Sequence, residues 1–454
     1  MRVAVIGNGA VGLMTAYKLS QDKNIQIDIF GDSKRIGAGS KAAGAMLVAF
    51  SELETDQLEN ETLSKRFELA ERSLREWPEF LKELCKETGV DLNIKLGIKV
   101  AKGKSTTPFE EEQFEYLNNI ESRYPDDVKQ NDDSIYLPSE LSIDARKYLQ
   151  AMSSHLERQS NVSVLNVNAQ YTFSGFNNSS VTLNWDDGLR SESYDHIIIA
   201  AGSRSREIML SDLELFEGVP DIYYGIGSAL LIEDVKENSF VSQHGSGVLR
   251  TMNRGGACGY HLVNCGSYYY FGATNAIHHK PEFKPRIESL NNLTEYLKKE
   301  FSEDFALQLA EPIVGFRPTT ADTLPLLGGI KNDRIIFATG NKRDGLTCSP
   351  QVAAEVINII TGKQRKYSIF NPKRDLLSYF DQNSAINKTA KSYLSGRYFH
   401  GNLKLENWDA ELKVETERLV EIYKGLSVPQ NFGIHPEVLN MFIHGRINSS
   451  HLAL

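Results

Sequence analysis

VAVIGNGAVG, residues 3–12, decides the fold, because a short apolar run leads directly into a G-x-G-x-x-G turn. The apolar run is typical of a central parallel strand that is covered on both faces. Residues 13–19, LMTAYKL, continue with helical character, so the glycines stand between a strand and a helix. This context predicts an α/β domain of the Rossmann type that binds a dinucleotide.

The three glycines of this turn have separate expected roles. Gly7 permits the tight turn, Gly9 lets the backbone approach a pyrophosphate, and Gly12 lets the helix pack closely on the strand. The N–H groups of Ala10 and Val11 stand at the positive end of the helix dipole. All five residues are therefore predicted to form the phosphate site.

An acidic residue follows the second predicted strand, residues 25–30. Asp32 lies 20 residues after Gly12, where a carboxylate would bind the ribose hydroxyls of adenosine. The alternative is a helix cap after an ordinary glycine turn. Lys34 and Arg35 follow closely and would suit a 2′-phosphate, which leaves NADP open at this point.

Residues 36–47, IGAGSKAAGAML, form a second segment of small residues. Small residues let backbone amides run close to a flat, extended ligand. A nicotinamide dinucleotide does not require a second such segment. A flavin dinucleotide does, because its ring lies against backbone beyond the pyrophosphate. The segment is too apolar for a flexible surface loop, and it favours FAD.

From this segment onward the chain resembles the D-amino-acid oxidase and glycine oxidase family of flavoproteins. That family follows its second strand with a Thr/Ser-containing, Ala-Ala-Gly loop that contacts the flavin. The resemblance implies that Ser40 contacts the pyrophosphate and that Ala43, Gly44 and Met46 lie beside the flavin ring. It also implies a Rossmann-like FAD-binding domain with an inserted, mostly antiparallel β-sheet domain over the flavin.

The resemblance continues through the middle of the chain. Residues 63–89 are predicted to form a long amphipathic helix. A strand near 162–169 would bring the Val167 backbone to the adenine, and a buried strand from 196 would place Ala201 and Gly202 against the cofactor. The apolar positions of the long helix recur at three- and four-residue steps and are assigned to the core: Leu63, Phe67, Ala70, Leu74 and Trp77.

The most specific motif is GFRPTTADTLPLLG, residues 315–328, which resembles the family pattern G-x-R-P-x-T-x-D-x-x-P-x-x-G. The resemblance implies that Arg317 binds the substrate carboxylate beside the flavin, because a guanidinium offers a planar fork with permanent charge. The alternative is a buried arginine paired with Asp322 or another acid. Covalent relatives have a cysteine near this position, so Arg317 implies non-covalent FAD, with Cys348 as the remaining candidate for a link.

Residues 340–350, GNKRDGLTCSP, resemble the glycine oxidase stretch G-H-x-R-x-G-x-x-x-x-P, with Asn341 in place of the histidine. Pro350 is expected in the first turn of the last FAD-domain helix. The resemblance implies that Arg343 stands at the mouth of the site, although a solvent-facing arginine is equally compatible. The amides of three residues are expected to face flavin N1 and C2=O, where reduction places negative charge: Gly345, Leu346 and Thr347.

Tyr260 precedes a family-like Gly-Ala-Thr turn at 272–274, where glycine oxidases place a substrate-contacting tyrosine. The resemblance implies that its hydroxyl bonds the carboxylate alongside Arg317. Strand alternation would then turn His261 to the opposite face, in a structural role. Residues expected to make the pocket larger or more polar are Arg250, Asn253 and Arg254.

In this family no side chain has to remove the reacting hydrogen. Flavin N5 takes a hydride from the carbon beside a neutral amine, leaving an imine that water hydrolyses, and oxygen as acceptor gives hydrogen peroxide. The protein supplies orientation and electrostatics. The sequence agrees, because it offers no compelling His/Asp or paired-carboxylate constellation.

The resemblance implies a discontinuous FAD-binding domain with the substrate domain inserted between its parts. The expected segments are 1–95, 140–220 and 313–363 for the FAD-binding domain, and 96–139 and 221–312 for the substrate domain.

Residues 364–454 lie beyond the resemblance. Residues 409–426 and 436–443 are predicted helices of this C-terminal extension. An isolated helical tail must bury its apolar side somewhere. It would cover the active-site entrance, join a homo-oligomer interface or recruit a partner, and these three roles stay open.

Composition argues against several other classes of protein: nucleic-acid-binding, disulfide-rich, metal-binding, membrane-spanning and secreted. The formal net charge of −9 argues against a nucleic-acid partner, and four scattered cysteines are too few for a disulfide framework or a metal site. No stretch approaches the roughly 18 apolar residues of a membrane span. The first residues run straight into a strand without a secretory signal, so a cytoplasmic protein is expected.

The leading expectation is an oxidase of an amine or amino acid. One alternative is a dehydrogenase of an amino or 2-hydroxy acid that passes electrons to a quinone or carrier. Another is a non-catalytic FAD-binding subunit that works through its tail. The substrate stays open among glycine, a D-amino acid, an N-alkyl amino acid and an amine on a larger intermediate.

Overall fold

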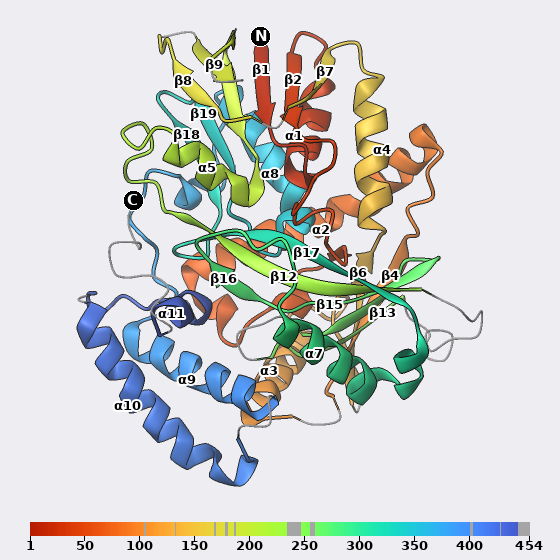
Figure 1. The fold of residues 1–454 in the computed structure, drawn as a ribbon, viewed down its shortest axis with the longest axis vertical. Coiled ribbons are helices and arrows are strands. Elements are labelled where there is room, and N and C mark those ends of the chain that lie inside the picture. The colour runs from red at the N-terminus through yellow and green to blue at the C-terminus, as the bar shows by residue number, and fades with distance from the viewer. Residues whose placement is uncertain are drawn as a thin grey trace.

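In the computed structural model, β1 (Arg2–Ile6) lies inside a six-stranded sheet of order β18-β19-β11-β1-β2-β7 (Figure 1). All neighbours are parallel except β18 and β19. The other strands are β2 (Gln26–Gly31), β7 (Val162–Asn166), β11 (His196–Ile199), β18 (Leu326–Ile330) and β19 (Ile335–Thr339). The structure describes residues 1–103, 106–131, 133–167, 169–177, 180–185, 188–233, 247–254, 259–399, 403–426 and 428–443.

Both faces of this sheet are covered, as the apolar run at its centre predicts. Val3 and Val5 point into a core formed with helices, while Ala4 and Ile6 point into a second core on the other face. The helices on the first face are α1 (Ala10–Ser20), α2 (Glu61–Thr88), α4 (Ala145–Glu157) and α8 (Gly345–Ile360). The second face is covered by β8 (Thr172–Ser174), β9 (Val181–Trp185), β10 (Arg190–Tyr194) and α5 (Ser205–Leu210).

Helix α2 confirms the helix predicted over 63–89. Its N-cap is Asn60, whose side chain accepts a hydrogen bond from the Leu63 N–H at 2.9 Å. The helix ends at Gly89, which takes the left-handed conformation with φ of 72°. All the apolar positions assigned to the core are buried: Leu63, Phe67, Ala70, Leu74 and Trp77.

A larger, mostly antiparallel sheet of order β16-β12-β15-β14-β13-β4-β6-β3 lies next to the first, and β17 pairs with β12. Only β13 and β4 pair in parallel among these neighbours. Figure 1 shows β12 and β17 curving together across the middle of the molecule. The strands are β3 (Met46–Leu47), β4 (Lys95–Ala101), β6 (Ser134–Ser142), β12 (Ile222–Glu233), β13 (Val248–Thr251), β14 (His261–Asn264), β15 (Tyr268–Gly272), β16 (Ala276–His278) and β17 (Ala310–Thr320).

The architecture is thus a Rossmann-like domain with an inserted antiparallel sheet, as predicted. All strands of the six-stranded sheet come from the three segments predicted for the first domain. However, β17 crosses the predicted boundary at 313 and β6 crosses that at 140, although both strands belong to the larger sheet. We propose that these two domain boundaries fall at the ends of the strands.

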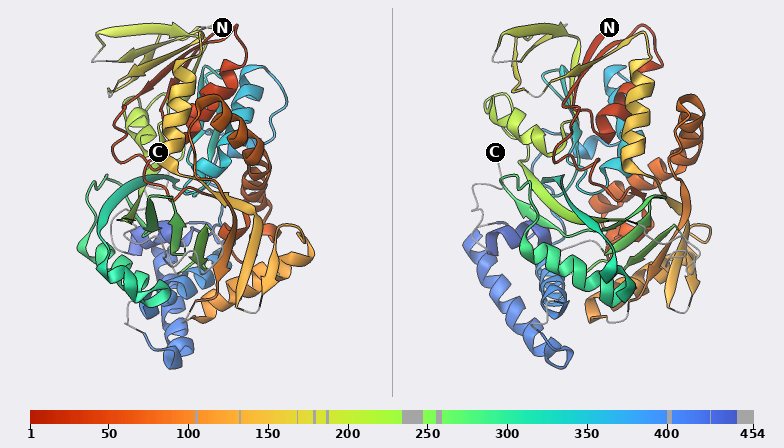
Figure 2. Two further views of the ribbon diagram at one scale, coloured as in Figure 1. Left: turned by 90° about the vertical axis from the view of Figure 1, so that its right-hand side faces the viewer. Right: turned by 45° about the vertical axis from the view of Figure 1, so that its right-hand side comes forward.

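The C-terminal extension forms α9 (Gln382–Phe399), α10 (Trp408–Leu426) and α11 (Pro436–Ile443). The last two match the predicted helices within one residue. Helix α9 was not predicted, because small and polar residues separate its few large apolar ones. Figures 1 and 2 show these helices on the side of the larger sheet that is away from the six-stranded one, with α10 outermost. They share a core with sheet residues Tyr223 and Ile277 and with Ala321, which buries the apolar side within the same chain.

Other expectations concern cysteines, metals and membranes. Cys85, Cys265 and Cys348 are free thiols, and Cys258 lies outside the described residues. Within the described ranges, no group of three or more His, Cys, Asp or Glu side chains is arranged to bind a metal ion. None of the helices described has both the length and the apolar character to cross a membrane.

The folding stability is expected to vary with pH through the buried carboxyl of Glu140, in β6. Its Oε1 atom accepts hydrogen bonds from the N–H groups of Ala49 and Ser51 at 2.8 and 2.9 Å. Burial raises the pKa of this carboxyl from 4.5 to about 7, although these hydrogen bonds oppose the rise. Because the pKa is higher in the folded state, the group's contribution is complete below about pH 4.5 and is lost as the pH rises to about 7.

Glu140→Gln mimics the protonated carboxyl and keeps an oxygen for both backbone donors. We expect the variant to match the wild type near pH 4.5 and to be about 3 kcal/mol more stable at pH 8. Urea unfolding at both pH values measures the difference. Parallel stability curves for the two proteins would show that Glu140 does not titrate in this range.

Candidate active site

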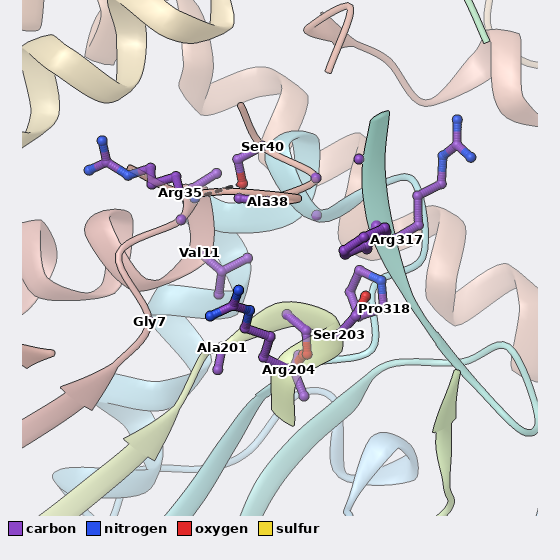
Figure 3. A pocket seen from close by; sticks show the side chains of 18 of the residues that line it. Gly7, Val11, Arg35, Ala38, Ser40, Ala201, Ser203, Arg204, Arg317 and Pro318 are labelled. Carbon is purple, nitrogen blue, oxygen red and sulfur yellow. Dashed lines mark hydrogen bonds between the residues drawn. The ribbon is translucent and has the colours of Figure 1, made fainter. Parts of the chain in front are cut away.

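An elongated cavity begins at the carboxyl ends of the parallel strands and extends to the larger sheet. This is the edge at which open α/β sheets bind ligands. Figure 3 shows Ala38 and Ser40 across the cavity from Ser203 and Arg204, with Arg317 at one end. Segments far apart in the sequence therefore meet at one site.

The glycine turn excludes side chains at two of its glycines. Gly7 has φ of 125°, and a Cβ atom there would lie 2.3 Å from the carbonyl oxygen of Ala200. A Cβ atom on Gly12 would lie 1.9 Å from the carbonyl oxygen of Gly7. Gly7 lines the cavity but Gly12 does not, so Gly12 supports the site through close packing and not through contact.

The start of α1 faces the cavity with Gly9, Ala10 and Val11. Ser40 Oγ accepts a hydrogen bond from the Ala10 N–H at 3.0 Å, and a Cβ atom on Gly9 would lie 3.2 Å from the same oxygen. This contact joins the glycine turn to the small-residue segment. A helix N-terminus beside a hydroxyl suits the phosphates of a dinucleotide.

Asp32 lines the cavity at the end of β2, and Val167 lines it nearby. The Asp32 side chain accepts a hydrogen bond from the Lys34 N–H at 2.8 Å, which orients the carboxylate. Arg35 donates to the Asn8 carbonyl at 2.9 Å and to Ser153 Oγ at 2.7 Å. Its guanidinium is thus engaged with protein groups, and the geometry favours ribose hydroxyls at Asp32 over a 2′-phosphate at Arg35.

The far half of the cavity is lined by Ala43, Gly44 and Met46 and, from the start of α8, by Gly345 and Leu346. These two segments bring backbone and small side chains to the same space. The helix N-terminus adds its positive dipole end. A planar group with partial negative charge on one edge suits this position.

Helix α8 begins at Gly345, so the prediction that Pro350 lies in its first turn is wrong. Pro350 stands inside the helix and has no N–H for the carbonyl of Leu346. That carbonyl instead accepts a hydrogen bond from Ser349 Oγ at 2.9 Å. The local hydroxyl compensates for the proline, and the helix can start five residues earlier.

Thr347, the third residue predicted at the flavin edge, does not line the cavity. Its Oγ1 atom accepts from the Val48 N–H at 3.1 Å, and its carbonyl accepts from Trp77 Nε1 at 2.8 Å. Thr347 therefore joins α8 to α2 and to the loop after β3. Its side chain is part of the core, because the helical rotation turns it away from the cavity. The predicted approach of the Thr347 N–H group to the flavin edge stays a prediction.

Arg317, on β17, reaches the cavity and is not paired with Asp322. Its Nη1 atom donates to the Thr274 carbonyl and to Asn275 Oδ1, each at 3.1 Å. Asp322 instead forms an ion pair with Arg374 at 3.0 Å. No ion pair joins Arg317 to a carboxylate within the described part of the chain, so its charge is available to an acidic ligand.

The guanidinium of Arg317 lies over Gly227 of the neighbouring strand β12. A Cβ atom on Gly227 would lie 2.5 Å from both terminal nitrogens. Register explains this closeness, because Arg317 pairs with Gly225 two residues away in the antiparallel ladder. The sheet therefore leaves room for the side chain to extend along its surface into the cavity.

The prediction that Tyr260 faces the site is wrong, and His261 takes that place. The Tyr260 ring stacks on Tyr296 and on Phe271, with centroids 4.6 and 5.7 Å apart. His261 lines the cavity, and its Nε2 would lie 2.8 Å from a Cβ atom on Gly44. The two side chains do alternate, but in the opposite phase, because the aromatic cluster around Tyr296 takes the tyrosine.

His261 is a neutral imidazole at pH 7. Burial and the positive charge of Arg250 together lower its pKa to about 4. The ring stacks on Tyr270, with centroids 5.5 Å apart, and Tyr270 also lines the cavity. The sheet thus presents two flat, uncharged rings towards Gly44.

Arg343 lines the cavity but does not face solvent, since its side chain is only 12% exposed. Its Nε atom pairs with Glu52 Oε2 at 3.0 Å. Arg250 also pairs with Glu52, at 2.8 Å, and is itself fully buried behind the cavity wall. Burial opposes ionisation of Glu52, but the charges of Arg343 and Arg250 lower its pKa to about 2.

The comparison with protein families gives one match to this chain. A family model described as FAD dependent oxidoreductase matches residues 2–359, which include every segment of the cavity wall. The chain belongs to this family. A search of curated proteins gave no match.

Several solved structures have a fold similar to that of this FAD-dependent oxidoreductase. Glycine oxidase from Geobacillus kaustophilus is 19% identical, with a TM-score of 0.69 over 83% of this chain and 100% of that one. Iminodiacetate oxidase from Chelativorans sp. is 18% identical, with a TM-score of 0.67 over 82% of this chain and 99% of that one. L-proline dehydrogenase from P. horikoshii is 16% identical, with a TM-score of 0.62 over 82% of this chain and 97% of that one.

The residues present fit the FAD that the family binds. The glycine turn has no room for a Cβ atom at Gly7, and a helix N-terminus with Ser40 stands where phosphates are expected. Asp32 stands at the ribose position, and the wall from Gly44 to α8 has room for a flat ring. The cavity is continuous across all three parts, as an extended dinucleotide requires.

Cys348 does not line this cavity. It is 1% exposed inside α8, and Ser73 Oγ donates to its carbonyl at 3.2 Å. Burial raises the pKa of the thiol well above its usual value. The enzyme therefore offers no thiolate at the ring from this position, which supports non-covalent FAD.

Several cavity residues were not predicted from the sequence. Arg204 and Ser203 follow the predicted Ala201 and Gly202 and point into the cavity (Figure 3). A basic residue directly after the small-residue turn was the available signal for Arg204. Lys342 and Asp344 flank Arg343 within the 340–350 stretch, which was the signal for them. Nothing local marks Glu52 or Tyr270, because only tertiary packing brings them to the wall.

Proposed function

We propose that this oxidoreductase oxidises the C–N bond of an amine or amino acid that carries a carboxylate. The single observation that carries the proposal is Arg317, a guanidinium at the cavity wall that no described carboxylate neutralises. Similar folds support the substrate class, since solved neighbours include a glycine oxidase, an iminodiacetate oxidase and an L-proline dehydrogenase.

The residues of the site would orient the substrate and stabilise charge. Arg317 would bind the carboxylate with its remaining N–H groups. Arg343, whose charge is paired with Glu52, would line the cavity wall beside it. The start of α8 at Gly345 would place its dipole against the flavin ring edge. Bound FAD supplies the hydride acceptor, so none of these side chains has to act as a base.

The proposal also includes the acceptor that takes the electrons from the reduced flavin. We infer oxygen, with hydrogen peroxide as product. The neighbours also include a dehydrogenase and an L-α-glycerophosphate oxidase, which keep a quinone or carrier acceptor and an alcohol substrate as the competing outcomes. A non-catalytic FAD-binding subunit is less consistent with a cavity that extends beyond the ring position to Arg317.

Anaerobic substrate screening tests the proposal. The purified FAD-loaded enzyme is mixed with glycine, N-alkyl glycines, iminodiacetate, D- and L-amino acids and 2-hydroxy acids, and the visible flavin absorption is followed. We expect a carboxylated amine to bleach the flavin and admitted air to restore it with formation of peroxide. Bleaching by 2-hydroxy acids alone would refute C–N oxidation, and reoxidation only by an artificial acceptor would refute the oxidase.

A further inference from the structure

The C-terminal extension brings charged residues to the active site from outside the family-matched region, which ends at residue 359. His435, directly before α11, and Glu437, in its first turn, are only 4% and 8% exposed. Val438, Leu439 and Met441 of the same helix pack into the core shared with Tyr223 and Ile277. Apolar packing therefore holds α11 in place, with Glu437 and the preceding His435 next to Lys342 of the cavity wall.

Glu437 contacts one segment of that wall and the side chain of Asn275. Its Oε1 atom pairs with Lys342 Nζ at 2.8 Å, and Arg343 Nη2 lies 3.8 Å from the same oxygen. Its Oε2 atom accepts a hydrogen bond from Asn275 Nδ2 at 2.8 Å. Burial opposes ionisation, but Lys342 and His435 lower the pKa of Glu437 to about 2, so it is a carboxylate.

Asn275 connects this carboxylate to the substrate-binding arginine. Its Oδ1 atom accepts a hydrogen bond from Arg317 Nη1 at 3.1 Å, while its Nδ2 atom donates to Glu437. An amide has one donor end and one acceptor end. A carboxylate can only accept, so Glu437 fixes the amide with its oxygen towards Arg317. With the amide reversed, two donors would face each other at Arg317.

We propose that Glu437 of the extension is a positioning residue for carboxylate binding, and that it orients Arg317 through the Asn275 amide. This inference rests on the proposed function of Arg317 as the carboxylate site. The extension thus completes the active site instead of only covering the sheet. A neutral side chain at 437 can present a donor to Asn275, which would release the amide and the arginine.

Ligand binding to the FAD-loaded enzyme tests the proposal without a known substrate. Acetate, pyruvate and anthranilate are titrated, and the flavin absorption change gives the Kd of the carboxylate that binds best. We expect Glu437→Gln to weaken binding about tenfold. Anthranilamide, which lacks the carboxylate, is expected to bind both proteins alike. An unchanged carboxylate Kd with FAD still bound would overturn the proposal.

Glu437 could affect binding through the Asn275 amide or through its ion pair with Lys342. A double-mutant cycle separates these two effects. If Glu437 acts through Asn275, the variants Glu437→Gln, Asn275→Ala and their combination weaken binding about equally. A combined loss of about a hundredfold would show independent effects and refute the relay. Glu421→Gln is the matched control, because Glu421 is an exposed glutamate of the extension paired only with Lys424 in the described contacts.

Two further measurements keep the outcomes distinct. Arg317→Lys with wild-type carboxylate binding would refute the proposed function, whatever Glu437 does. A crystal structure of Glu437→Gln decides the inference even if no probe binds. We expect the contact between the Asn275 side chain and Arg317 Nη1 to be lost, and an unchanged contact would refute the positioning role.

Discussion

Arg317→Ala lowers kcat/KM for a carboxylated amine by about 10³-fold or more, while the enzyme keeps its FAD. The magnitude corresponds to the loss of a charge-assisted, bidentate contact of about 4 kcal/mol in a partly buried site. The protein tolerates the change because Arg317 forms no ion pair within the described residues and gives up only the hydrogen bonds to Thr274 and Asn275. Steady-state kinetics and the flavin spectrum measure the two parts.

Arg317→Lys refines this prediction. Lysine keeps the positive charge but lacks the planar fork, so we expect an intermediate loss of about 10²-fold. An amide analogue of the substrate serves as control, since its turnover is expected to fall much less than that of the acid. Equal losses for acid and amide would mean that Arg317 shapes the cavity without binding the carboxylate.

Gly12→Ala gives the second large effect, in which the purified protein loses its bound FAD. The new Cβ atom would lie 1.9 Å from the Gly7 carbonyl oxygen, a contact between backbone and Cβ that no rotamer change can relieve. The helix must then move away from β1 and distort the phosphate turn. We expect stability to fall by about 3 kcal/mol and FAD affinity by about 10²-fold or more.

Gly425→Ala is the matched control for this change. Gly425 also lies in a helix, α10, but apart from its chain neighbours and its own helix backbone no described atom lies within 4 Å of a Cβ atom built there. We expect stability to be unchanged or to rise by up to about 1 kcal/mol, since alanine favours helices. Flavin absorption per mole of protein and thermal unfolding compare the two variants. Full FAD content in Gly12→Ala would refute the close-packing role.

Most of the fold could be predicted because its signals are local. The glycine turn stands between β1 and α1, the helix over 63–89 is α2, and two helices of the extension begin and end within a residue of their predicted positions. Boundaries are less certain where one residue has two readings. Pro350 is compatible with a first turn and with a helix interior, and the Ser349 hydroxyl allowed the second.

The site could be predicted only in part, because side-chain direction depends on what covers each face. Alternation at Tyr260 and His261 was predictable, but its phase was decided by the aromatic cluster at Tyr296. Thr347 and Leu346 are adjacent in α8, yet only Leu346 reaches the cavity. Glu52 carries no motif, and a single acidic residue gives no signal until Arg250 and Arg343 surround it.

The sequence by itself determined the cofactor class and the position of Arg317, because glycine spacing and the R-P-x-T-x-D motif act through neighbouring residues. Only the tertiary structure decided that His261 faces the ring position, that Arg317 is not paired with Asp322, and that Glu437 reaches the site through Asn275. The contact between Arg317 and Asn275 joins residues 42 positions apart in the chain, and that between Asn275 and Glu437 joins residues 162 positions apart. No local pattern encodes them, since they depend on how whole sheets and helices pack.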